Sequence, residues 1–155
     1  MRATFLASLL FPACAALAGA QTDGATAQRP ERGVHLTLFR SPATGLELRA
    51  GHAAAFAGWY PTVLRRNGEN DPTSFIRAGG TYYLKARGAG PFVSPSIVFS
   101  LDDDWSHGAL TEVGWRGRLV RRLNGRLGAA VLTTTDGRVR VNPTVGMDLA
   151  LRGAR

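Results

Sequence analysis

The sequence predicts an all-β protein: an eight-stranded antiparallel up-and-down barrel with short turns and strands long enough to be transmembrane. Apolar and polar residues alternate with a period of two in segments that recur at intervals of roughly 10–15 residues between turn signals. The segment 138–152 keeps this alternation for about 14 residues, whereas a strand of a soluble sheet usually keeps it for roughly 4–8. A tilted strand needs about 9–11 residues to cross a bilayer. No apolar stripe at helical spacing persists after residue 33.

The first 20 residues have the pattern of a cleaved export signal peptide. Arg2 supplies the positive charge, an apolar segment begins at Thr4, and Ala18-Gly19-Ala20 places small residues before the expected cleavage site. Residues 21–33 are polar and are expected to form a flexible leader, which leaves 34–152 as a single barrel domain. An alternative is a lipoprotein modified at Cys14, the only cysteine of the chain. Cleavage would remove Cys14, so the barrel is expected to contain no disulfide.

The chain is basic, with 19 Lys and Arg residues against 11 Asp and Glu residues and a formal net charge of +8. A basic chain can indicate a nucleic-acid-binding protein. Here the arginines are spread through the alternating segments and form no dense cluster, and an exported protein seldom meets nucleic acid. We therefore expect no nucleic-acid partner. Anionic lipid head groups, or acidic side chains inside a barrel, are the more natural partners of this charge.

Four strands are expected in the first half of the domain, at 34–40, 44–49, 52–63 and 74–85. Their connections are expected at a turn, 41–43, and at a polar loop, 65–72, and a further turn at 86–91 follows the fourth strand. Alternation places one set of side chains on the polar face of these strands. That set includes His35, Thr37, Glu47, Arg49, Arg77 and Tyr83.

Four more strands are expected at 92–101, 109–122, 126–134 and 138–152, with an acidic loop at 102–108. The polar face of the last three strands lies at even positions, and a hairpin must pair like faces. A three-residue turn at 123–125 would pair Arg122 with Arg126, and one at 135–137 would pair Thr134 with Arg138. Both turns would end in glycine, which readily adopts the left-handed conformation needed there.

Closure of the barrel turns the polar faces inward. At eight strands the interior is filled by side chains, so the lumen is expected to be plugged. Because unpaired buried charge is costly, the inward arginines should pair with inward acids. The expected lumen charge network consists of Glu47, Arg77, Glu112, Arg116, Arg118, Arg126, Arg138, Arg140 and Asp148. Arginines outnumber acids in this set, so some must reach the rims or solvent.

Aromatic residues gather near the ends of the expected strands. They are Trp59, Tyr60, Phe75, Tyr82, Tyr83, Phe92 and Trp105. Such positions suit the aromatic girdles that lie at the two surfaces of a membrane. The alternative is ordinary packing in the core of a water-soluble barrel or sandwich.

The final strand ends in the pattern polar, any, Gly, any, any, hydrophobic, any, hydrophobic, carried by Thr144, Gly146, Leu149 and Leu151. With the alternation and the export signal, this pattern resembles the small bacterial outer-membrane β-barrels of the OmpA/OmpX type over roughly residues 34–151. The resemblance implies a monomer in the outer membrane of a Gram-negative cell, with both termini in the periplasm. It also implies that these four residues form the assembly signal read by the barrel-assembly machinery. The expected partners are that machinery and outer-membrane lipids, including lipopolysaccharide.

No residue pattern predicts catalysis, a cofactor or a metal site. His35, His52 and His107 lack the His-x-Ser pattern of lipid A deacylases, and the acidic run at 102–104 lacks EF-hand spacing. The expected function is therefore that of a non-enzymatic, porin-like outer-membrane barrel with a structural or surface role. Two alternatives stay open. One is a soluble periplasmic barrel or sandwich that binds an apolar ligand, and the other is a lipid-modifying outer-membrane enzyme.

Overall fold

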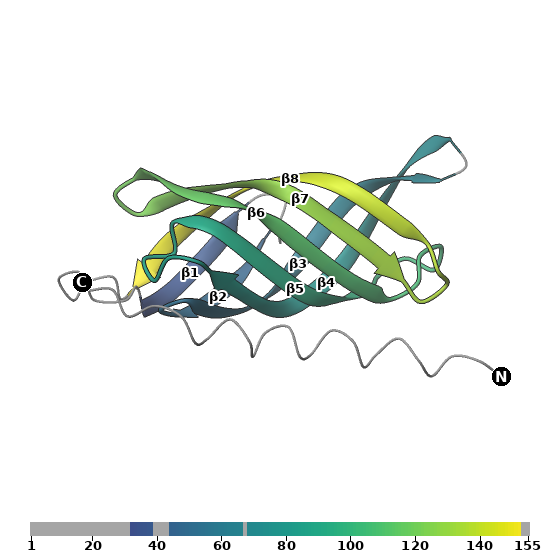
Figure 1. Ribbon diagram of the computed structural model, residues 1–155. Helices are drawn as coiled ribbons and strands as arrows, with labels where there is room; N and C mark the ends of the chain where they lie inside the picture. Colours follow the sequence, from purple (N-terminus) through teal and green to yellow (C-terminus); the bar gives the residue numbers. More distant parts are fainter. Residues whose placement is uncertain (1–31, 39–43, 67, 153–155) are drawn as a thin grey trace.

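The computed structural model describes residues 32–38, 44–66 and 68–152, which form one closed antiparallel barrel (Figure 1). Each strand pairs with the next in sequence, so the predicted eight-stranded up-and-down fold is confirmed. The strands are β1 (Arg32–Leu38), β2 (Thr44–Ala50), β3 (Ala53–Arg66), β4 (Glu69–Tyr83), β5 (Gly90–Ser100), β6 (Gly108–Val120), β7 (Leu123–Thr134) and β8 (Val139–Arg152).

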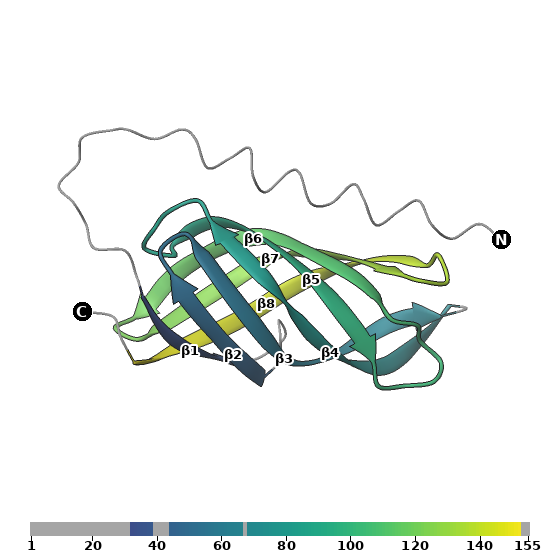
Figure 2. The same cartoon turned by 90° about the horizontal axis from the view of Figure 1, so that it is seen from below.

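The barrel closes where the first strand meets the last. β1 pairs with β8 antiparallel, with Leu36 opposite Leu149 and Thr37 opposite Asp148. Figure 2 shows these two strands side by side along the closing seam. Every described strand thus has two hydrogen-bonded neighbours along at least part of its length. In the described residues, β3 pairs with β2 only up to Trp59, and β8 pairs with β1 only from Met147 onward.

Strand alternation sorts the side chains into a polar interior and an apolar outer surface. In β6, β7 and β8 the even positions point inward, as Glu112, Arg126 and Asp148 show, and the odd positions point outward. β1, β2 and β4 use odd positions for the inward face. The faces predicted from the sequence are therefore those observed. The most exposed apolar side chains of the outer surface include Leu48, Ile97, Val113, Trp115, Leu127, Val141 and Val145.

The region 65–72, expected to be a polar loop, is instead a continuation of two strands. β3 runs to Arg66 and β4 begins at Glu69, and these two residues pair directly. Gly68, with φ of 90°, supplies the left-handed conformation that reverses the chain. Pro72 pairs with Val63 inside the strand region. The hairpin extends beyond the neighbouring strands at one end of the barrel (Figure 1).

One of the two glycine turns was placed wrongly. Val120 pairs with Leu123, so the β6–β7 turn lies at 121–122 rather than at 123–125. A register shift between Arg118 and Val120 absorbs the difference, and the even faces still pair, as Arg116 opposite Arg126 shows. Gly125 is therefore an ordinary strand residue.

The β7–β8 turn is the predicted one. The Thr134 N–H donates to the Arg138 carbonyl oxygen at 3.0 Å. Gly137 has the left-handed φ of 84° that this turn requires.

Several expectations lie partly or wholly outside the described residues. The export signal at 1–20, Cys14 and the turn at 41–43 fall there. The leader was expected to end at Gly33, whereas β1 already begins at Arg32. Among the residues that are described, no helix is long and apolar enough to cross a membrane.

The interior holds two apolar clusters in addition to charged groups. The larger cluster contains Tyr60, Leu64, Phe75, Val98, Trp105, Leu110, Ala130 and Leu132. The smaller contains Ala54, Tyr83 and Phe92. Five aromatic residues expected in interfacial girdles are therefore buried. Strand alternation turns four of them inward, whereas Trp105 lies in the 102–108 loop and donates through Nε1 to Asp71 Oδ2 at 2.9 Å. Trp59, at 45% exposure, stays on the outer surface.

Glycine allows the close approach of β6 and β7. Gly114 and Gly128 pair across these strands. A Cβ atom added at Gly114 would lie 2.3 Å from the Leu127 carbonyl oxygen, and one at Gly128 would lie 2.3 Å from the Val113 carbonyl oxygen. No real side chain tolerates such distances, so larger residues here would force the strands apart. Gly117 differs, because a Cβ atom there would meet nothing within 4 Å.

We expect Gly114→Ala to destabilise the barrel by about 1–3 kcal/mol, since the added methyl group overpacks a rigid backbone contact. Gly117→Ala makes the same chemical change in the same strand and should shift stability by no more than about 0.5 kcal/mol. Urea titration of the two variants measures the difference. Equal midpoints would show that the β6–β7 contact does not constrain residue size.

Candidate functional site

The candidate site is a network of ionised side chains across the middle of the barrel interior. Its members, including His35 and Tyr83, come from six of the eight strands, and each charged member is at most 6% exposed. Its cations are Arg49, Arg77, Arg116 and Arg126, and its anions are Glu47, Glu112 and Asp148. His35 and Tyr83 are buried among them. Strand alternation places every one of these side chains on an inward face.

Glu112 is the acid of the first centre. Arg77 Nη1 donates to Glu112 Oε2 at 3.0 Å, and the Thr144 hydroxyl donates to Oε1 at 3.0 Å. Arg126 Nη2 lies 3.6 Å from Oε2. Arg77 also donates through Nε to the Ser96 hydroxyl at 2.8 Å. This carboxylate therefore joins β4, β6, β7 and β8.

Glu47 is the acid of the second centre. Arg49 Nη2 donates to Glu47 Oε1 at 2.5 Å, and the Tyr83 hydroxyl lies 2.9 and 3.0 Å from the two carboxylate oxygens. Arg126 Nη1 lies 3.5 Å from Oε2. Arg126 is thus shared between Glu47 and Glu112, and it links the two centres.

Asp148 is the acid of the third centre, next to the closing seam. Arg116 donates to both of its oxygens, with Nε 2.7 Å from Oδ2. His35 Nδ1 and Asn124 Nδ2 each lie 3.0 Å from Oδ1. Arg116 Nη1 also donates to the Gly88 carbonyl oxygen at 2.7 Å. One side chain therefore ties the seam to the β4–β5 turn.

Aromatic rings offset the excess of buried arginine. Four guanidinium groups face three carboxylates, which leaves one positive charge in the network if His35 is neutral. The guanidinium carbon of Arg49 lies 3.8 Å from the ring centre of Tyr83, and that of Arg126 lies 4.2 Å from that of Phe92. Ring faces attract cations, more strongly in a site without water. The inward aromatics are therefore part of the electrostatics of the interior.

The structure brings together six of the nine residues expected in the lumen network. They are Glu47, Arg77, Glu112, Arg116, Arg126 and Asp148. The other three lie nearer the ends of strands, where the surplus arginines were expected to reach the rims or solvent. Arg118 is exposed, Arg138 Nε pairs with Asp136 Oδ2 at 2.9 Å with a side chain 34% exposed, and Arg140 Nη1 donates to the Val139 carbonyl oxygen.

Sequence analysis left three members out of the network. Arg49, His35 and Tyr83 were placed on polar faces but not grouped with the acids. The available signal was the two-residue spacing of Glu47 and Arg49 on one inward face. The partner of His35 could not be found in this way, because Asp148 is 113 residues away.

The three histidines lie in three different environments. His35 is buried beside Asp148. His52 Nδ1 lies 2.7 Å from the Tyr83 carbonyl oxygen, and its ring stacks on Tyr82. His107 Nδ1 accepts from the Ser100 N–H at 3.1 Å. In the described part of the chain, no group of three or more His, Cys, Asp or Glu side chains could hold a metal ion.

The expected assembly-signal residues lie along β8. Thr144 and Gly146 are buried on the inward face, Leu149 is partly exposed and Leu151 is 48% exposed on the outward face. Thr144 is the one that contacts the charge network, through its hydrogen bond to Glu112.

The acidic loop at 102–108 is fastened to β4 by one carboxylate. Asp102 Oδ2 accepts from the Ser74 N–H at 2.7 Å and from the Thr73 hydroxyl at 2.8 Å. These two hydrogen bonds hold the pKa of Asp102 below its ordinary value. In the β7–β8 turn, the Thr134 hydroxyl likewise lowers the pKa of Asp136. Both carboxylates therefore keep their charge at neutral pH.

We expect Glu112→Leu to destabilise the barrel by about 3–5 kcal/mol, because it leaves Arg77 and Arg126 buried without their shared acid. The double variant Glu112→Leu, Arg77→Met should recover part of that loss, since it removes one of the stranded charges. Asp136→Asn, which removes an exposed ion pair, should leave the urea midpoint nearly unchanged. A similar midpoint for all three variants would show that the buried charges are not coupled.

Comparisons with known proteins add no relative. No protein-family model, no curated protein and no solved structure matches the chain. Function is therefore inferred from three observed features: the closed sheet, the charged interior and the apolar outer surface.

Proposed function

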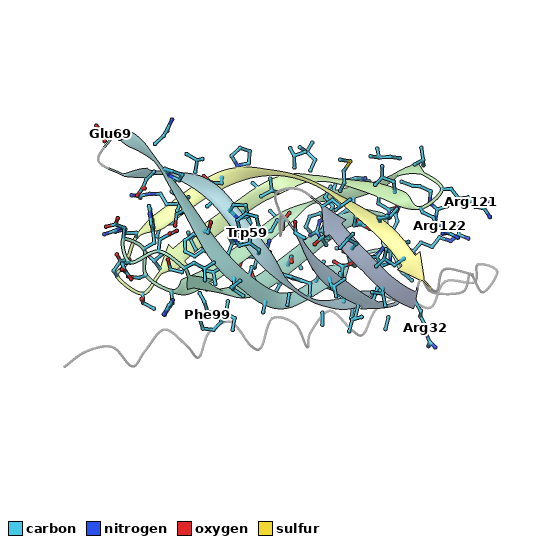
Figure 3. All side chains as sticks on the ribbon, turned by 180° about the vertical axis from the view of Figure 1, so that it is seen from behind. Arg32, Trp59, Glu69, Phe99, Arg121 and Arg122 are labelled. Atoms are coloured by element: carbon cyan, nitrogen blue, oxygen red, sulfur yellow. The ribbon has the colours of Figure 1, made fainter. Side chains whose placement is uncertain are left out.

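We propose that this chain is an integral outer-membrane β-barrel with a structural or surface role and a plugged polar lumen. The main support for this proposal is the reversed polarity of the barrel. Large apolar side chains cover its outside (Figure 3), and its inside holds paired charges beside two apolar clusters. A protein surrounded by water normally has the opposite arrangement.

The outer surface has the extent that a lipid contact requires. Nineteen large apolar residues of the described chain are between 41% and 66% exposed. Monomeric soluble proteins rarely expose apolar patches larger than a few hundred Å². The six strands from β3 to β8 have 11 to 15 residues each, and about 9–11 suffice to cross a bilayer when tilted.

Closure of the sheet supports the same proposal. In hydrocarbon every backbone N–H and C=O group needs a protein partner, and only helices and closed barrels satisfy this requirement. The β1–β8 seam closes the sheet here, with β1 paired to the last residues of β8. Membrane lipids, including lipopolysaccharide, are the proposed partners of the outer surface, and the barrel-assembly machinery is the proposed partner of β8 during insertion.

The interior favours a membrane barrel over a carrier of apolar ligands. A soluble carrier needs an apolar cavity, whereas the interior described here holds four arginines and three acids held together by ion pairs. These paired groups plug the lumen. They also provide a rigid support for the loops and hairpins at the two ends, where a surface role would be carried.

Fractionation and electrophoresis test the proposal directly. The protein should appear in the outer-membrane fraction, and the unboiled sample should migrate differently from the boiled one because the closed barrel resists detergent. Recovery in the soluble fraction with no heat-dependent change in mobility would reject the membrane barrel.

A substitution on the outer surface tests whether that surface contacts lipid or water. Val113 lies near the centre of β6 and is 53% exposed. In a bilayer, Val113→Arg should destabilise the folded barrel by about 2–4 kcal/mol, whereas in water an exposed substitution of this kind costs about 0.5 kcal/mol or less. The control is Thr135→Arg, in the exposed β7–β8 turn. Urea titration in lipid vesicles measures both, and equal stability would contradict membrane insertion at Val113.

A further inference from the structure

The two ends of the barrel carry opposite charge. One end, which we call the acidic end, bears Glu69, Asp71, Asp102, Asp103, Asp104 and Asp136. The other, which we call the basic end, bears the exposed side chains Arg32, Lys85, Arg87, Arg118, Arg121 and Arg122. Figure 3 shows Arg32, Arg121 and Arg122 at one end and Glu69 at the other. Every acid of the described residues lies in the interior or at the acidic end, so the basic end attracts anions.

An apolar groove lies on the outer surface next to the basic end. It has a volume of about 790 Å³ and is formed by β6, β7 and β8. Its floor is glycine, because Gly117 and Gly125 pair across β6 and β7. Trp115, Leu119 and Met147 are among the side chains that line it. A Cβ atom at Gly117 would meet nothing within 4 Å, so a side chain at this position would extend into the hollow.

Three exposed arginines stand at the end of this groove. Arg118 belongs to its lining, and Arg121 and Arg122 form the β6–β7 turn just beyond. A guanidinium group binds a phosphate oxygen pair through two parallel N–H donors. An apolar groove that ends in such donors matches a molecule with a hydrocarbon chain attached to a phosphate.

We propose that this groove holds an acyl chain of an anionic glycerophospholipid, whose phosphate contacts Arg118, Arg121 and Arg122. The inference rests on the proposed membrane location. A zwitterionic lipid fits less well, because its own cation would lie beside the arginines. A second copy of the chain fits less well too, since it would bring an equal number of positive charges to the same place.

Tryptophan fluorescence tests the proposal, because brominated acyl chains quench a tryptophan that they touch. Trp115 lines the groove and is 57% exposed, whereas Trp59, on β3 and 45% exposed, lies outside it. Trp105 is buried and gives a constant background. Two reporter variants, Trp59→Phe and Trp115→Phe, isolate the two exposed sites. Each is refolded into phosphatidylcholine vesicles that contain brominated phosphatidylglycerol or brominated phosphatidylcholine.

Brominated phosphatidylglycerol should occupy the Trp115 site with at least about fivefold preference over brominated phosphatidylcholine, since one surface arginine already provides a factor of this size. Trp59 should show little preference. The double variant Arg121→Gln, Arg122→Gln should reduce the preference at Trp115 towards one. Arg87→Gln, at the same end but in the β4–β5 turn, is the matched control and should leave it unchanged.

The variant Gly117→Phe tests whether the lipid preference depends on the groove or only on attraction to the arginines. It places a ring on the floor of the groove while leaving all three arginines, and it should abolish the preference although the barrel still shows its heat-dependent mobility. The proposal is overturned if the wild type shows no preference for brominated phosphatidylglycerol, or if the preference survives Gly117→Phe. It is also overturned if Arg87→Gln reduces the preference as much as the Arg121→Gln, Arg122→Gln double variant does. If equimolar lipopolysaccharide displaces brominated phosphatidylglycerol from the Trp115 site, a glycerophospholipid is the wrong occupant. If neither brominated lipid quenches Trp115 or Trp59, the membrane location itself fails.

Discussion

The buried charges of this barrel must neutralise one another, because an eight-stranded barrel has an interior filled by side chains rather than by a water column. An isolated charge in such surroundings is costly, and breaking a buried pair costs several kcal/mol. Three acids and four arginines meet this requirement only as a group. Arg126 lies between Glu47 and Glu112, and rings of Tyr83 and Phe92 face the guanidinium groups. The charge network therefore depends both on closure of the sheet and on the inward facing of these side chains.

The polar interior and the apolar exterior follow from a single sequence property. With a period of two, one strand supplies both surfaces, and a one-residue slip would exchange them. β8 shows how tightly this is specified. Its inward Asp148 meets Arg116, while its outward Val145 is 57% exposed. A slip of one residue would place that carboxylate on the outer surface and Val145 among the buried charges, so the register is fixed from both sides.

Much of this fold could be predicted because alternation and turn chemistry are local signals. The faces of β1 and β4 and the turn closed by Gly137 follow from a few adjacent residues. The β6–β7 turn was misplaced because a register shift near Arg118 changes the pairing without changing either face. The inward aromatics were misread as girdles because strand ends alone do not say which face a ring occupies. The partners within the network depend on the sheet's three-dimensional closure, so Arg118, Arg138 and Arg140 could not be separated from the buried arginines in advance.

The contact between His35 and Asp148 spans 113 residues and joins the first strand to the last. The two residues cannot meet until the whole chain has been made and the sheet has curled into a ring. Non-local contacts of this kind slow folding, because chain entropy is lost before the contact forms. A chain lacking β8 would keep His35 and Arg116 while losing the carboxylate that both contact. A chain without β8 would therefore have to bury His35 and Arg116 without Asp148. The cost of burying that unpaired charge disfavours a barrel that closes before the chain is complete.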